Sequence, residues 1–155
     1  MSDLVRYILD YLDTNLYRDV SIDELSSYFG YEKSYLMKKF KIETGISIKN
    51  YVNRIRIYKS IDMLFHDELL LKVALENGFH SLEYYSEMFT KVMGFNPSTF
   101  KKYRQGQLSK EELEIVKNSM IQCTLFYTQL HNLRKEKEEN KILRLEIPKE
   151  KKYVA

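Results

Sequence analysis

Apolar residues recur along this chain at three- and four-residue spacings, which is the period of an α-helix. Leu4, Ile8, Leu12 and Leu16 give the clearest example and predict an opening amphipathic helix over about 3–16. Helices are also predicted from Ser21, over about 32–43, over about 47–65, around Leu70 to Ala74, from Ser81, and from Asn96 to about Arg104. The pattern therefore predicts an all-α fold.

Polar residues mark where several of these helices begin. Ser21 with Glu24, and Ser109 with Glu112, have the spacing of a capping box, in which each side chain binds the other residue's backbone N–H. Asn96 followed by Pro97 predicts another start, with asparagine as the cap and proline in the first helical position.

Two stretches of the chain repeat one pattern. The first contains Leu25, Gly30, Tyr31, Tyr35, Leu36, Phe40, Gly45 and Tyr51, and the second contains Val73, Gly78, Phe79, Tyr84, Tyr85, Phe89, Gly94 and Phe100. The second copy has one extra residue after its first glycine, and the later positions stay in register. Each copy predicts a short helix, a glycine turn and a second helix, so the chain is predicted to carry two helix-turn-helix motifs, typical of a DNA-binding regulator.

The second helix of the first copy has an outward face suited to reading DNA. If Leu36 and Phe40 face the core, the opposite side presents Lys33, Ser34, Met37, Lys38 and Lys41. Lys38 could donate to guanine or to phosphate, and Met37 could contact a thymine methyl group. We expect Lys38 to contribute most.

The equivalent helix of the second copy is acidic where the first is basic. Its outward positions are Leu82, Glu83, Ser86 and Glu87. A carboxylate is repelled by phosphate, although it can accept a hydrogen bond from cytosine N4. The second copy is therefore expected to read a cytosine, or to bind DNA weakly and dock a protein instead.

Charge is distributed unevenly along the chain. Residues 30–60 contain eight basic and two acidic residues, a net charge of +6, whereas residues 61–90 contain one basic and six acidic residues, a net charge of −5. Residues 91–104 are again basic, at +4. The basic stretches would attract a phosphate backbone. Phosphate contacts are predicted at Arg54, Ser81, Lys101 and Lys102. Ser21 could also contact phosphate, although Ser21 and Ser81 are equally explained as plain helix caps. Arg56 and Arg104 could contact the phosphate backbone or simply solvate the surface.

These residues resemble the DNA-binding domain of the AraC/XylS family. The resemblance covers about 1–104 and is carried by the first copy, Gly30, Tyr31, Tyr35, Leu36, Phe40, Lys41, Gly45, Tyr51 and Arg56, and by the second, Gly78, Phe79, Tyr84, Tyr85, Ser86, Phe89, Gly94, Phe95, Asn96, Pro97, Ser98, Phe100, Tyr103 and Arg104. It implies a bacterial transcription regulator, with helix-turn-helix motifs over about 3–46 and 66–104 joined by a linker helix over about 47–65. It also implies that recognition helices enter successive major grooves, and that Ser34, Met37 and Lys38 touch bases.

The C-terminal extension, 105–155, is predicted to contain a long helix. Its apolar seam is Leu113, Val116, Met120, Cys123, Tyr127 and Leu130. Such a seam could pack on the DNA-binding domain, on a second copy as a homodimer, or on both. Leu143, Leu145 and Ile147 alternate with charged residues, which predicts a short terminal strand; otherwise residues 142–155 form a tail.

Composition narrows the possible functions. The single cysteine, Cys123, excludes an internal disulfide, and we expect a soluble, cytoplasmic protein without a membrane span, associated with the nucleoid when bound to DNA. His66, His80 and His131 lie far apart, so no metal, cofactor or catalytic site is predicted. The expected partners are double-stranded DNA, RNA polymerase and a second copy of the chain. The competing hypothesis is an adaptor that uses the helix-turn-helix scaffold to bind another protein.

Overall fold

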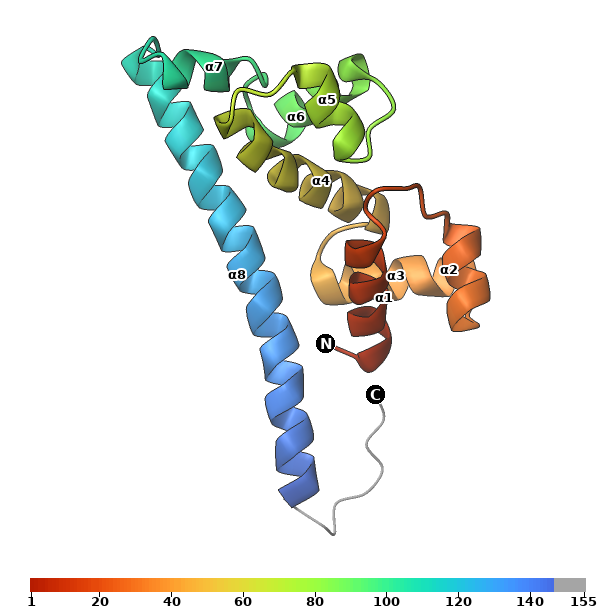
Figure 1. The fold of residues 1–155 in the computed structure, drawn as a ribbon. Helices are drawn as coiled ribbons and strands as arrows, with labels where there is room; N and C mark the ends of the chain where they lie inside the picture. Colours follow the sequence, from red (N-terminus) through yellow and green to blue (C-terminus); the bar gives the residue numbers. More distant parts are fainter. Residues whose placement is uncertain (147–155) are drawn as a thin grey trace. The chain divides into compact units, whose positions relative to one another are not determined.

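A computed structural model describes residues 1–146, and the side chains of residues 1–135. All regular elements in this range are helices, which confirms the all-α fold (Figure 1). They are α1 (Asp3–Thr14), α2 (Ile22–Phe29), α3 (Lys33–Thr44), α4 (Ile48–Phe65), α5 (Leu70–Glu76), α6 (Leu82–Met93), α7 (Thr99–Arg104) and α8 (Lys110–Glu146).

The chain folds into two compact units, each assembled from separate stretches of sequence. The first unit contains residues 1–14, 20–48 and the chain from Leu125, and the second contains residues 15–19 and 49–124. The first helix-turn-helix, α2 and α3, lies in the first unit, and the second, α5 and α6, lies in the second unit. The predicted division at residue 104 stays a prediction.

Each unit has its own apolar core. The first core contains Val5, Ile8, Leu9, Leu12, Leu25, Leu36 and Phe40. The second core contains Tyr51, Ile55, Ile57, Ile61, Val73, Ala74, Phe79, Tyr85, Phe89, Met93 and Phe100. Equivalent positions of the two sequence repeats, such as Leu36 with Tyr85 and Phe40 with Phe89, are buried in both units, so the repeat reflects two copies of one packing pattern.

The predicted serine caps are confirmed. The Oγ atoms of Ser21, Ser81 and Ser109 accept hydrogen bonds from the N–H groups three residues later, at 3.0, 3.1 and 3.1 Å. At Ser109 the Glu112 carboxylate also accepts from the Ser109 N–H, at 3.3 Å, which completes a capping box. The Glu24 carboxylate accepts a hydrogen bond from the Tyr11 hydroxyl, which ties α2 to α1.

Two predicted helix boundaries and one predicted strand need correction. The opening helix ends at Thr14 rather than at residue 16; Leu16 lies in the turn that follows, where its carbonyl accepts a hydrogen bond from Arg56 Nε at 2.9 Å. Helix α7 begins at Thr99 rather than at Pro97, because the Thr99 N–H donates to the Asn96 carbonyl at 3.1 Å and closes a turn first. Leu143 and Leu145 lie in α8, so the predicted strand is wrong there, and Ile147 lies outside the described residues. A helix satisfies its own backbone, whereas a lone strand needs a partner.

Tyr85 provides a pH-dependent contribution to the second core. Its hydroxyl shares a hydrogen bond of 2.8 Å with Ser60 Oγ, and burial raises its pKa to about 12. Because an unfolded tyrosine titrates near pH 10, neutral Tyr85 stabilises the fold fully below about pH 10, and this contribution is lost as the pH rises through about 12. The loss should be on the order of 2 kcal/mol.

Tyr85→Phe should therefore lose less unfolding free energy than the parent between about pH 9 and pH 12. At neutral pH it should be less stable by about 1 kcal/mol, because the hydrogen bond to Ser60 is gone. Urea unfolding followed by circular dichroism at both pH values measures the difference. Equal alkaline losses in the two proteins would mean that Tyr85 does not cause the pH dependence.

Candidate nucleic-acid interface

The first reading helix, α3, is fixed by a buried face. Leu36 and Phe40 are fully buried one helical turn apart, as predicted. The helix ends at Gly45, whose φ of +80° places it in the left-handed region, and the Gly45 N–H donates to the Lys41 carbonyl. Since two large side chains anchor one side, the opposite side is held toward solvent.

That opposite side carries all five residues predicted for it. Lys33, Ser34, Met37, Lys38 and Lys41 are exposed. Lys33 forms an ion pair with Asp23 of α2. Among the residues whose side chains are described, neither Lys38 nor Lys41 has a carboxylate partner within 4.0 Å. These two ammonium groups are available to an external anion.

A polar cluster ties α3 to the start of α1. The Glu43 carboxylate accepts hydrogen bonds from the Ser2 backbone N–H and, at 2.8 Å, from the Ser2 hydroxyl. It also lies 3.2 Å from Lys39 Nζ. Burial acts to raise the pKa of Glu43, but the bonds from Ser2 and Lys39 outweigh it and lower that pKa, whereas the bond to Glu43 raises the pKa of Lys39. Lys39 is thereby engaged within the protein, in contrast to Lys38 and Lys41.

The second reading helix, α6, has the same construction with different charges. Tyr85 and Phe89 are buried, and Gly94 ends the helix at a φ of +80°. Glu83 and Glu87 are exposed, whereas Leu82 and Ser86 are half-buried. Neither glutamate has a basic partner within 4.0 Å among the described side chains. The acidic character predicted for this helix is therefore present at its surface.

The other predicted phosphate-binding residues lie in the second unit. Arg54 is half-buried on α4, whereas Lys101 and Lys102 are exposed on α7. Lys102 Nζ lies 4.0 Å from the Glu112 carboxylate, and Arg104 forms an ion pair of 3.2 Å with Asp67. Ser81 is occupied as a helix cap, which leaves its role toward phosphate a prediction.

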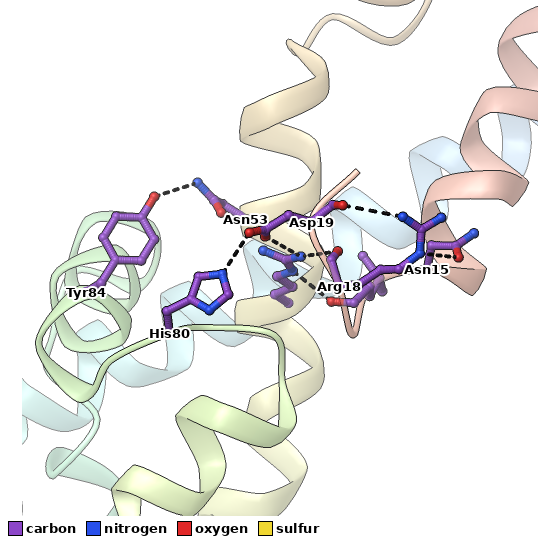
Figure 2. A network of polar contacts seen from close by, with 8 residues as sticks. Asn15, Arg18, Asp19, Asn53, His80 and Tyr84 are labelled. Carbon is purple, nitrogen blue, oxygen red and sulfur yellow. Dashed lines mark hydrogen bonds and ion pairs between the residues drawn. The ribbon is translucent and has the colours of Figure 1, made fainter. Parts of the chain in front are cut away.

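Arg56 is structural, which the sequence left open. It is only 6% exposed, and its guanidinium donates to the carbonyls of Leu16 at 2.9 Å and Arg18 at 2.8 Å. Figure 2 shows the surrounding network, in which Asp19 contacts His80 Nε2 at 2.7 Å. The His80 contact lowers the pKa of Asp19. This network joins residues 15–19 to α4 and to the start of α6. It could not be predicted from the sequence, because no local pattern pairs residues so far apart.

The predicted dimer seam of α8 is partly covered within the chain. Val116 and Leu130 are buried, Leu113, Met120 and Cys123 are half-buried, and Tyr127 is exposed. Burial raises the pKa of the Cys123 thiol, which favours its neutral form. The seam thus contributes to packing inside the monomer; its use in a dimer stays a prediction.

Two helix-turn-helix motifs with exposed second helices define the class of this protein. The sequence profile of the helix-turn-helix domain family matches residues 25–103, about half of the chain. The chain belongs to the AraC-type helix-turn-helix family, a family of transcription regulators and not of enzymes.

Relatives in sequence and in structure agree with this assignment. An uncharacterized HTH-type transcriptional regulator of Staphylococcus aureus is 33% identical over 100 residues, which are 64% of this chain but 13% of that protein. The chain thus spans about an eighth of the length of that relative.

The fold is shared with solved domains. The C-terminal domain of AraT, a response regulator from Geobacillus stearothermophilus, superimposes with a TM-score of 0.63 at 24% identity, over 70% of this chain and 90% of that one. The DNA-binding domain of AdpA, solved in complex with a target DNA, superimposes with a TM-score of 0.61 at 18% identity, over 69% of this chain and all of that one. Within the described part of this protein, no helix combines the length and apolar character needed to cross a bilayer.

Proposed function

We propose that this protein is a transcriptional regulator that binds double-stranded DNA sequence-specifically, mainly through α3. One observation carries the proposal: α3 is anchored by Leu36 and Phe40 and presents two exposed lysines, Lys38 and Lys41, without carboxylate partners among the described side chains. Membership of the AraC-type family supports it. The DNA complex of the AdpA domain shows that a protein of this fold can bind DNA.

The chemistry of the α3 face suits the major groove. The Lys38 ammonium can donate to guanine O6 and N7, the Ser34 hydroxyl can pair with several base edges, and Met37 can pack on a thymine methyl group. Lys33 and Lys41 are better suited to phosphate, which positions the protein without reading sequence.

The second helix-turn-helix should contribute less affinity. Glu83 and Glu87 repel phosphate, and Glu87 can accept a hydrogen bond from cytosine N4. Phosphate contacts by Arg54, Lys101 and Lys102 would offset part of the repulsion. We therefore expect this motif to select a cytosine, or to leave DNA and contact protein.

Binding to DNA should depend steeply on salt. We expect selection from a random duplex pool to yield a preferred sequence, and the logarithm of the affinity to fall with the logarithm of salt by about 0.9 per phosphate neutralised. Fluorescence anisotropy of a labelled duplex, titrated at several salt concentrations, gives this slope. An absent or salt-independent interaction would instead favour the adaptor hypothesis.

Partners beyond DNA follow from the proposed role. We expect RNA polymerase to be a protein partner of this regulator. We expect the regulator itself to lie in the cytoplasm and to associate with the nucleoid when it binds DNA. A homodimer through α8 would place four helix-turn-helix motifs on one site. Among the α8 residues whose side chains are described, the large apolar ones left exposed for it are Ile115, Ile121, Leu125 and Tyr127.

A further inference from the structure

Helix α5 and its N-cap residue expose three leucines that the proposed reading of DNA does not use. Leu69 is 78% exposed, and Leu71 and Leu75 are each 53% exposed. Leu71 and Leu75 are four residues apart, so they lie on one face of the helix. The core contacts of α5 are made instead by Val73 and Ala74, which are fully buried. We call Leu69, Leu71 and Leu75 the α5 leucine ridge.

The internal repeat shows what an ordinary surface looks like at these positions. Before the first glycine of each copy the two repeats align without a gap, so Leu69, Leu71 and Leu75 correspond to Ser21, Asp23 and Ser27 of α2. All three residues of α2 are exposed and polar. The fold thus accepts polar residues at these positions, and the second copy carries leucine at each of them.

One residue of the ridge stands where the first repeat has a stabilising helix cap. Ser21 caps α2 by accepting a hydrogen bond from the Glu24 N–H, whereas Leu69 occupies the cap position of α5 and makes no side-chain cap bond. Leucine is among the poorest cap residues. A departure from local stability rules without a structural gain points to an interaction outside the chain.

The surroundings of the ridge are acidic. Glu68 lies three residues before Leu71, and Glu76 adjoins Leu75. Within residues 61–90, which include the whole ridge, Lys72 is the single basic residue of the sequence against six acidic ones. Lys72 and Glu68 form an ion pair at 3.2 Å and neutralise each other, which leaves Glu76 as the acidic group beside the ridge. An apolar stripe with an acidic border complements a helix that has apolar residues on one face and lysine or arginine beside them.

We propose that the α5 leucine ridge is a docking site for a basic amphipathic helix of another protein. The leucines provide the apolar contact, and Glu76, which is exposed and has no basic partner within 4.0 Å among the described side chains, selects for positive charge next to it. This surface would let the second helix-turn-helix recruit a protein whether or not α6 touches DNA.

The test uses the full chain and a phage-displayed library of helical peptides. We expect enrichment of peptides with apolar residues at three- and four-residue spacing, flanked by lysine or arginine. An enriched peptide, labelled with fluorescein, should bind Leu71→Asp/Leu75→Ser at least tenfold more weakly than the parent. These are the residues that α2 carries at the same places, so folding should be preserved, as circular dichroism can verify.

Two further variants test whether acidic charge beside the ridge, rather than acidic charge on α6, contributes to peptide binding. Glu76→Gln should flatten the salt dependence of peptide binding. Glu87→Gln, which removes the same charge from α6, should leave peptide affinity unchanged. DNA affinity of Leu71→Asp/Leu75→Ser should match the parent, so loss of the peptide site and loss of DNA binding are measured independently.

Several outcomes would overturn the proposal. Enrichment of acidic peptides alone, or equal peptide affinity for the parent and the leucine variant, would remove the docking site. Self-association in sedimentation experiments that disappears in the leucine variant would assign the ridge to a second copy of the chain. Leucine-dependent binding to anionic or neutral phospholipid vesicles would assign it to a membrane surface.

Discussion

Alanine at position 78 should destabilise this protein by about 2–5 kcal/mol, a large part of the stability of a typical domain. Gly78 has a φ of +86°, which costs an L-residue about 1–2 kcal/mol. A Cβ there would lie 2.4 Å from the Leu16 carbonyl oxygen and 2.8 Å from Arg56 Nε. Relieving these contacts would disturb the partly buried hydrogen bond from Arg56 Nε to the Leu16 carbonyl, which adds about 1–3 kcal/mol.

The matched control is alanine at position 30, the equivalent glycine of the first repeat. Gly30 has a φ of +77°, but a Cβ there would meet nothing within 4 Å. Gly30→Ala should therefore cost only the backbone term, about 1–2 kcal/mol. Urea unfolding followed by circular dichroism measures both variants. Equal losses would show that the close approach of Arg56 and Leu16 to Gly78 does not add to the cost.

Lys38→Ala should weaken binding to the selected DNA sequence by about 10- to 100-fold, and base preference at one position should relax. The reason is that Lys38 is exposed on α3 and has no carboxylate partner among the described side chains. Competition anisotropy at one fixed salt concentration, with duplexes that differ at single base pairs, measures affinity and preference together.

Glu87→Ala is the matched control, since Glu87 occupies the position of Lys38 in the second repeat. It should change affinity much less, or raise it slightly because a repulsive charge is removed. Lys101→Ala should lower affinity for all sequences equally and reduce the salt slope by about one. A larger loss for Glu87→Ala than for Lys38→Ala would place the main reading face on α6.

The interior of both helix-turn-helix motifs could be predicted from sequence because it depends on local spacing. Leu36 with Phe40, and Tyr85 with Phe89, are four residues apart, and this spacing alone places each pair on one helix face. The exposed face of α3 could then be predicted as the side of the helix opposite Leu36 and Phe40. Serine caps were equally readable, since the capping bond spans three residues.

Contacts between distant residues could not be predicted in the same way. The bonds from Arg56 to the carbonyls of Leu16 and Arg18 join residues about forty positions apart, and no pattern marks backbone carbonyls as acceptors. Likewise, α1 stops at Thr14 although Leu16 continues its apolar period. The exposure of Leu71 and Leu75 also needed the structure, because leucine at helical spacing ordinarily indicates a buried face.

The all-α class, the tandem repeat and the basic face of α3 can be derived from the amino-acid sequence, because periodicity, capping and charge act over one or two helical turns. The structural role of Arg56, the lack of room for a side chain at Gly78 and the exposure of Leu71 and Leu75 became visible in the folded chain. These features depend on which distant segments meet, and that is set by packing of the whole chain rather than by any local sequence rule.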